Sequence, residues 1–469
     1  MINKIAQMAK PLIVGTGLFI GASVISVATD RVASGISVSF VSTAEAQKKK
    51  IKTRRLPGIK EATMKRLAKI TELTNPDTEK NPNAKPNFNE ALKELKSMER
   101  WCNKSCNDYE KAQVFRFYAF SYYSLEDYPK AIGAYKQVVS KSPNIPIAVE
   151  LDSLSALSQL HYAQEDYRGA LKYLNDWMAL NTSKVPADKI FLRCTIHYAN
   201  NDKTSALKDC NKAIADVESR GKVAKESWYN LQVALNLEKE RYKESKPILE
   251  KLIVNYPKAK WWTRYANVSG LLGSEKTQLA ALDATNVMGG LQKRQDIVNT
   301  AYLYMGADAP YKGAQVLKSG MDSGKVERNV KYLKILANAY RASKEPKKAI
   351  KVLNEAAKKA KKEDAANKGK KKYRPVEGNV YAELVSLYGI DEQNKEAISA
   401  GKKALAAGQL KRACEVHTNM GISYVELGQF KSAISSFQQA RKEKACRAYV
   451  SSWIKYAQNE QKSKEALAR

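Results

Sequence analysis

The sequence predicts an all-α protein, a solenoid of about nine to ten stacked helix pairs followed by one capping helix. Three observations predict this fold class. Large apolar side chains recur three and four residues apart within short segments, which is the period of one helix face. The segments come in twos around a short polar break, and the double unit recurs about every 34 residues. A single helix pair cannot bury its own apolar face, so copies of it must stack on one another.

The clearest copy of the unit runs from Ala112 to Pro143. With Ala112 as position 1, large apolar residues occupy positions 4, 7, 11, 17, 21, 24 and 27, and alanines occupy positions 8 and 20. The break at Leu125 to Asp127 separates two segments with helical spacing, so we expect it to join two antiparallel helices. Most of the chain after this unit reads as altered copies of it.

The first 46 residues have the order of a secretory signal. Lys4 and Lys10 precede an apolar run from Pro11 to Ala28, and the small-residue site Ala44-Glu45-Ala46 comes just before Gln47. We therefore expect cleavage before Gln47. The alternative is an uncleaved anchor, since about 18 apolar residues can just span a bilayer. Both alternatives place the remaining chain outside the cytoplasm.

Residues 47–57 are basic and lack apolar periodicity, which predicts a flexible tether. Residues 58–111 then form an atypical first repeat, with helices expected at 59–74 and 88–98 and a long loop between them. Terminal repeats often depart from the pattern in this way.

The main repeat array covers residues 112–360. Its further copies are 151–184, 187–220, 226–259, two looser units between Trp261 and Gly324, and 330–360. A lysine-rich insert at 361–377 interrupts the array, and we read it as a solvated loop or, alternatively, as a docking tail for an acidic partner. The array continues over 378–447 with copies at 378–410 and 414–447. Residues 448–469 are expected to form the capping helix, with Tyr449, Trp453 and Tyr456 meeting the last repeat.

The chain of 469 residues carries a formal charge of +32. Cleavage of residues 1–46 would remove three basic and two acidic residues and leave +31. Such an excess attracts anionic partners or surfaces but does not specify a fold. The predicted export signal, and basic residues spread along the chain rather than gathered in a stripe, argue against nucleic acid as a partner.

The six cysteines form an even set in a chain expected to reach an oxidising compartment. In an antiparallel helix pair, residues face each other when their positions add up to a constant set by the turn. The repeat positions of Cys194 and Cys210 add up to 32, and those of Cys414 and Cys446 add up to 34. Each pair of cysteines should therefore bridge its own helix pair. Cys102 and Cys106 are four residues apart beside a turn and can close a small loop. We predict disulfides 102–106, 194–210 and 414–446, with buried free thiols as the alternative.

The unit at 112–143, with its apolar positions, small residues at 8 and 20 and closing proline, resembles the tetratricopeptide repeat family, as does the unit beginning at Cys414. The resemblance implies a right-handed solenoid whose concave side is built by the first helix of each pair. It also implies binding of peptides or proteins rather than catalysis. The family presents positions 2, 5, 9 and 12 on the concave side, which suggests a partner-binding groove at Arg116, Phe120, Tyr123, Tyr162, Phe191, Tyr198, Asn230, Trp262 and Tyr265. Packing of some of these rings into the repeat core is the alternative.

Other specific sites find little support in the sequence. Lys334 and Asn338 match the first pair of the family's carboxylate clamp, but Glu383 and Glu415 stand where further clamp residues would be needed. His161, His197 and His417 occupy packing positions and are expected in the interior. No glycine-rich phosphate loop, G-x-S-x-G elbow or H-E-x-x-H pair occurs. We therefore expect neither an enzyme, nor a bound metal, nor a cofactor.

The whole-chain layout resembles a narrower group. A long signal ending before Gln47, a basic tether and repeats with paired cysteines look like the periplasmic tetratricopeptide proteins of the second TonB system in marine gammaproteobacteria. This resemblance implies a periplasmic scaffold that assists TonB-dependent uptake of iron complexes, with TonB, ExbB, ExbD or outer-membrane receptors as partners. The alternative is a basic cell-envelope scaffold that holds peptidoglycan or an anionic membrane surface.

Overall fold

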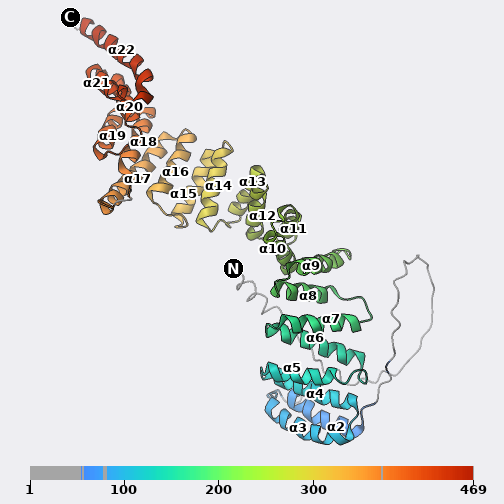
Figure 1. Cartoon of the computed structure of the whole chain (residues 1–469). Helices are drawn as coiled ribbons and strands as arrows, with labels where there is room; N and C mark the ends of the chain where they lie inside the picture. Colours follow the sequence, from blue (N-terminus) through green and yellow to red (C-terminus); the bar gives the residue numbers. More distant parts are fainter. Residues whose placement is uncertain (1–53, 55–57, 78–81, 371–372, 468–469) are drawn as a thin grey trace, which may run out of the picture. The chain divides into compact units, whose positions relative to one another are not determined.

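The computed structural model describes residues 54, 58–77, 82–370 and 373–467, and all regular structure within them is helical (Figure 1). These residues form 21 α-helices and no strand. The predicted signal at 1–46 lies outside the described residues, as does most of the predicted tether at 47–57. Arg54 is described, and its guanidinium forms an ion pair with Glu150 at 2.6 Å between Nη1 and Oε2. The all-α fold class is confirmed.

The chain divides into two compact units, residues 1–241 and 242–469. In the first unit every helix packs against the next one along the chain. Its helices are α2 (Glu61–Thr74), α3 (Phe88–Ser105), α4 (Asp108–Ser124), α5 (Tyr128–Val139), α6 (Ile147–Ala163), α7 (Tyr167–Leu180), α8 (Ala187–Ala199), α9 (Lys203–Glu218) and α10 (Glu226–Glu238).

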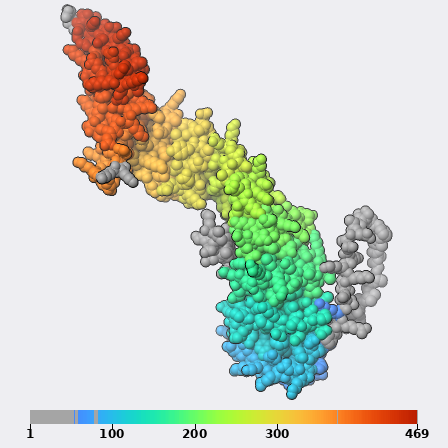
Figure 2. All heavy atoms as spheres, in the orientation of Figure 1, coloured from blue at the N-terminus to red at the C-terminus, as the bar shows by residue number. Residues whose placement is uncertain are grey.

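In the second unit, too, every helix packs against the next one along the chain, and the colours of Figure 2 change along this unit in sequence order. Its helices are α11 (Tyr242–Asn255), α12 (Ala259–Leu271), α13 (Glu275–Val287), α14 (Arg294–Gly306), α15 (Pro310–Asp322), α16 (Val330–Ala342), α17 (Pro346–Ala366), α18 (Glu377–Ile390), α19 (Asn394–Ala407), α20 (Ala413–Glu426), α21 (Phe430–Arg441) and α22 (Lys444–Leu467). The two repeats that look irregular in the sequence, between Trp261 and Gly324, form the regular helix pairs α12–α13 and α14–α15.

The turn inside a helix pair has a fixed geometry that the sequence shows only in part. Position 15 adopts a left-handed backbone, with φ of 60° at Glu126, 60° at Glu165, 61° at Asn201 and 65° at Gly428. The next backbone N–H then donates back to the carbonyl of position 11, as from Asp127 to Tyr122 at 2.9 Å. This bond satisfies a carbonyl that the helix end would leave without a partner.

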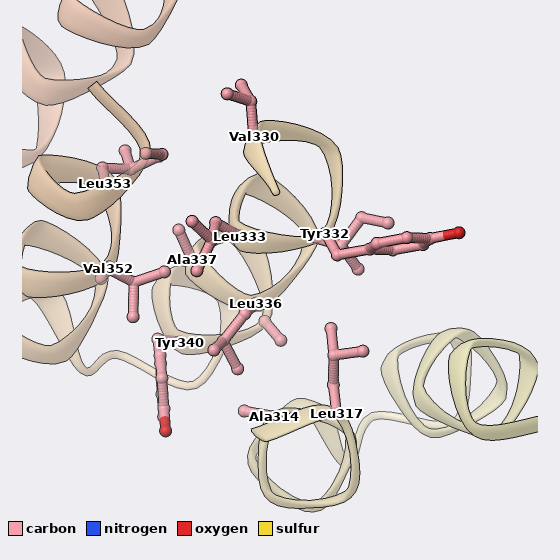
Figure 3. Packing of buried hydrophobic residues seen from close by; sticks show 14 of the residues in the cluster. Ala314, Leu317, Val330, Tyr332, Leu333, Leu336, Ala337, Tyr340, Val352 and Leu353 are labelled. Atoms are coloured by element: carbon pink, nitrogen blue, oxygen red, sulfur yellow. The ribbon is translucent and has the colours of Figure 1, made fainter. Parts of the chain in front are cut away.

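The core of the second unit shows how each first helix is buried between its neighbours. In Figure 3 Leu333, Leu336 and Ala337 of α16 lie between side chains of α15 and α17. Leu333, Leu317 and Leu353 are 0 to 1% exposed. Burying a leucine side chain completely is worth about 1.5 to 3 kcal/mol, so the stack depends on such contacts between successive helices.

Part of the lysine-rich insert is helical, so the loop is shorter than expected. Residues 361–366 continue α17, because Lys, Ala and Glu are good helix formers and Ala357 and Ala360 pack inward. The other end of the insert is anchored by Asp364, whose carboxylate accepts hydrogen bonds from the backbone N–H groups of Val376 at 3.0 Å and Glu377 at 2.9 Å. These bonds fix the start of α18.

The capping helix α22 begins at Lys444, four residues before the expected start, and buries a different face. Val450, Ile454 and Ala457 pack inward, whereas Tyr449 and Tyr456 are 56% and 48% exposed. The expected inward position of these two tyrosines was therefore wrong. Aliphatic side chains recurring at spacings of four and three fill the contact with the last pair, and the phenol hydroxyls reach water.

The structure joins the six cysteines in the three predicted pairs. Cys102 and Cys106 bridge the end of α3, and Cys194 on α8 is bonded to Cys210 on α9 within one helix pair. Cys414 and Cys446 differ from the expected placement, because Cys446 belongs to α22 and not to α21. This disulfide therefore ties the first helix of the last pair to the capping helix.

Candidate functional site

The candidate binding surface in the first unit follows the first helices of successive pairs, α4, α6, α8 and α10. We call it the first-helix face. It comprises Arg116, Phe120, Tyr123, Asp152, Ser155, Tyr162, Asp188, Lys189, Phe191, Tyr198, Lys225 and Asn230, and the predicted groove residues among these are all half-buried.

Charged side chains link neighbouring helices across this face. Arg116 on α4 approaches Asp152 on α6, with 4.0 Å between Nη2 and Oδ2. Lys225 forms an ion pair with Asp188 on α8 at 2.7 Å between Nζ and Oδ1. The side chains of Asp152 and Asp188 are 73% and 70% exposed, so each carboxylate keeps room for another partner.

Lys189 is a half-buried cation on this face with contacts to neighbouring helices. Its ammonium donates a hydrogen bond to the Ser155 hydroxyl on α6 and lies 5.2 Å from the centre of the Trp177 ring. Burial lowers the pKa of Lys189, while Asp152 and Asp188 act in the opposite direction. The ammonium thus connects α6 to α8 beside both exposed carboxylates.

The predicted aromatic residues are wedged between helices and are not free on the surface. Phe120 meets Phe88 edge-to-face with ring centres 5.7 Å apart, and Tyr123 lies 5.9 Å from Tyr128. Phe191 on α8 stacks on Trp228 of α10 at 4.4 Å. Part of each ring therefore belongs to the packing of the stack, as the alternative interpretation required.

The tyrosines toward the ends of the first helices behave in the same way. Tyr162 lies 5.8 Å from Tyr167, and burial raises its pKa to about 12. The Tyr198 hydroxyl donates to the Glu238 carboxylate at 2.9 Å, and burial together with this hydrogen bond raises its pKa to about 12. Both phenols remain neutral hydrogen-bonding groups near pH 7.

Trp262 and Tyr265 lie on α12 in the second unit and are not part of the first-helix face. Their rings meet edge-to-face at 6.4 Å. The Tyr265 hydroxyl donates to Glu250 on α11 at 2.9 Å. Burial raises the pKa of Tyr265 to about 12, with the hydrogen bond to Glu250 adding to it.

The sequence interpretation missed the two exposed carboxylates. Asp152 and Asp188 both occupy position 2 of their units, which is one of the positions the family presents on this side. The predicted groove residues were chosen mainly for their aromatic rings. An acidic residue that recurs at position 2, in a chain of net charge +32, could have indicated these two carboxylates.

The remaining sequence candidates have local partners. Lys334 forms an ion pair with Glu383 at 2.7 Å between Nζ and Oε1, so the lysine of the incomplete clamp is already occupied. His161 is buried with its Nδ1 2.7 Å from Asp166 Oδ2, and burial lowers the pKa of His417. Within the described parts of the chain, no group of three or more His, Cys, Asp or Glu side chains could hold a metal ion. None of the helices described is long and apolar enough to cross a bilayer.

Comparison with known proteins identifies the repeat unit. The tetratricopeptide repeat model matches residues 118–144, the end of α4 together with α5. A search of curated proteins found no match to the sequence.

Several solved structures are similar to parts of the chain. The MamA protein is 17% identical, covers 41% of this chain and 94% of its own, and has a TM-score of 0.32. A tetratricopeptide repeat protein from Parabacteroides merdae is 10% identical, with coverage of 58% and 98% and a TM-score of 0.29. YrrB, described as a tetratricopeptide repeat protein with an unusual peptide-binding site, is 12% identical, with coverage of 43% and 92% and a TM-score of 0.32. The tetratricopeptide repeat model thus matches one unit of this chain, at 118–144, and the other described helices are likewise packed in successive pairs.

Proposed function

We propose that the chain is an exported scaffold that binds an extended segment of a partner protein along the first-helix face. The observation that carries the proposal is the pair of exposed carboxylates, Asp152 and Asp188, beside half-buried aromatic rings on successive helices. An extended segment could pair its own basic groups with these carboxylates and place apolar side chains on the rings.

The paired cysteines support the export part of the proposal. Cys102, Cys194 and Cys414 are each bonded to a second cysteine in the structure, which leaves no free cysteine among the described residues. Disulfides of this kind persist in oxidising compartments such as the periplasm. With the secretory signal expected at 1–46, they favour a periplasmic protein. N-terminal sequencing of the mature chain should give Gln47, and a retained Met1 would contradict cleavage.

For the partner we propose components of a TonB-dependent outer-membrane uptake system for iron complexes. The support is the layout of the chain, with a signal, a basic segment and repeats bearing paired cysteines. Crosslinking in intact cells followed by purification of the chain should then recover TonB, ExbB, ExbD or an outer-membrane receptor. Recovery of none of these proteins would contradict this assignment of partner.

The first-helix face is tested best through its exposed carboxylates. Phe120→Ala and Tyr123→Ala would also remove ring contacts inside the stack, so loss of binding could reflect loss of packing. Asp152→Asn combined with Asp188→Asn leaves the packing intact and should weaken partner binding about tenfold, or about 1.4 kcal/mol. Asp176→Asn on α7, an exposed carboxylate away from this face, is the matched control. Equal affinity of the double variant and the control would exclude the face as the binding site.

One observation favours a second candidate, a scaffold that contacts an anionic envelope surface. Around the end of α17, Lys358, Lys361, Lys362 and Lys368 are exposed, and within the described chain no carboxylate lies within ion-pair distance of them. Each lysine near an anionic membrane is worth about 1 kcal/mol, in a salt-dependent way. Sedimentation with vesicles of anionic phospholipid, and with isolated peptidoglycan, should show binding that is lost at high salt. Sedimentation unaffected by replacing these four lysines with glutamine would contradict it.

A further inference from the structure

Two aromatic side chains of the capping helix, the half-buried Trp453 and the exposed Tyr456, line a feature at the end of the second unit that the packing does not explain. Trp453 and Tyr456 line an open hollow of about 270 Å³ together with Val425, Glu426 and Ser452. The hollow lies between the end of α20 and the middle of α22, the helix coloured red in Figures 1 and 2. Packing does not account for Tyr456, which is 48% exposed.

The two rings form a fixed corner. Trp453 stacks on the buried Phe437 of α21, with 5.8 Å between ring centres, and this contact holds the indole in place. Tyr456 stands against Trp453 at 5.9 Å with the ring planes at 89°. The contact with Trp453 holds the exposed Tyr456 ring in place at the hollow, and an exposed aromatic face attracts a cation because it carries partial negative charge.

The charges around the hollow also favour a cation. Glu426 is exposed, is the last residue of α20, and has no ion-pair partner among the described residues. The C-terminal end of a helix carries partial negative charge from the aligned peptide dipoles. Close by, the ammonium of Lys464 donates to the Gly428 carbonyl at 3.1 Å and lies 5.8 Å from the Phe430 ring centre, so this end of the unit already holds one cation in the same manner.

We infer that this hollow binds an arginine side chain of a partner protein, with the guanidinium against the exposed Tyr456 ring and paired with the Glu426 carboxylate. Arginine suits the site better than lysine, because its planar guanidinium can stack on a ring and pair with both carboxylate oxygens. The inference is independent of the first-helix face, which lies in the other unit.

The test uses the full chain labelled with ¹⁵N at tryptophan and the peptide acetyl-Gly-Arg-Gly-amide as the probe. The indole N–H resonance of Trp453, assigned through Trp453→Phe, should shift in a saturable way as the peptide is added. Glu426→Gln and Tyr456→Ala should each weaken binding at least about fivefold. Tyr449→Ala removes an exposed ring of α22 that does not line the hollow, so it should leave the affinity for the peptide unchanged. The melting temperatures of all the variants should be compared with that of the wild type to control for folding.

Three results would overturn the inference. The first is an equal shift with acetyl-Gly-Gln-Gly-amide, which lacks the positive charge. The second is saturable binding of choline without binding of the arginine peptide, which would assign the hollow to a small quaternary ammonium compound. The third is wild-type affinity in both Glu426→Gln and Tyr456→Ala.

Discussion

Gly421 allows α20 and α21 to approach closely. A Cβ atom at this position would lie 2.4 Å and 2.6 Å from two carbons of the Phe437 ring. Phe437 is fully buried and also stacks on Trp453, so the ring has no free space into which it could move. Glycine is required here by close packing and not by backbone conformation.

Replacing Gly421 with alanine should therefore destabilise the second unit. Overpacking of a buried contact costs about 1 to 3 kcal/mol, which outweighs the gain from alanine's higher helix propensity. Urea unfolding followed by circular dichroism should show the lower midpoint. Gly133→Ala is the matched control, because Gly133 lies exposed on α5 with nothing within 4 Å of an added Cβ. It should stabilise the chain by about 0.5 to 1 kcal/mol. A Gly421→Ala variant as stable as the wild type would show that Phe437 can move.

Single residues differ in how far the sequence determines their place. The pairing of Cys194 with Cys210 could be predicted from the repeat register, because the two positions face each other in one helix pair, whereas Cys446 paired as predicted from a different helix than the register gave. The contact of Phe191 with Trp228 could not be predicted, because it depends on the distance between neighbouring pairs. Asp152 and Asp188 were missed for another reason, since an exposed carboxylate imposes no packing requirement that a pattern could show.

The second helices α5, α7 and α9 begin in the same way. Asp127, Asp166 and Asp202 at position 16 each accept a hydrogen bond from the backbone N–H of the third residue of the following helix, at 3.3, 2.9 and 3.0 Å. Each of these aspartates has a lowered pKa, caused first by a hydrogen bond from the Lys130 ammonium, the Gly169 N–H and the Ser205 hydroxyl respectively. The caps therefore depend on ionised carboxylates.

These caps should make the first unit sensitive to acid. A lowered pKa in the folded state gives stability that is present above the ordinary value of 3.8 and is lost as the pH falls below it. Thermal unfolding compared at pH 7 and pH 3 should show the loss. At pH 7, Asp202→Ala should cost about 1 kcal/mol, whereas Asp202→Asn keeps an N-cap oxygen and should cost less. Equal losses in both variants would mean that the charge alone, and not the cap, matters.

At the scale of elements, the sequence predicted which segments are helices better than where they end. The long spacing patterns of α4 and α5 gave nearly correct bounds. The lysine-rich end of α17 was read as loop because it lacks an apolar stripe, although intrinsic propensity continues the helix. In α22 all three aromatic residues were expected to face the last pair; Trp453 does pack on it, but Val450, Ile454 and Ala457 take the places expected for Tyr449 and Tyr456.

Within each unit the molecule is a one-dimensional stack. Every helix packs on its chain neighbours, and the contacts that skip one helix, such as α18 with α20 and α20 with α22, remain local. Stability in such an array is approximately a sum of the repeats and of the interfaces between neighbours. A defect at one interface should therefore lower stability near that interface and leave distant repeats unchanged.

Gly421→Ala provides a direct test of this locality. Amide hydrogen exchange should quicken in α18 to α22, where the overpacked contact with Phe437 weakens the stack, and should be unchanged in α2 to α9. The control Gly133→Ala should slow exchange around α4 to α6 and leave the second unit unaffected. The disulfide between Cys414 and Cys446 ties α20 to α22, so its reduction should widen the affected region within the same unit. Faster exchange of equal size in α2 to α9 would show that the chain opens as one cooperative structure, which a stack of local interfaces does not predict.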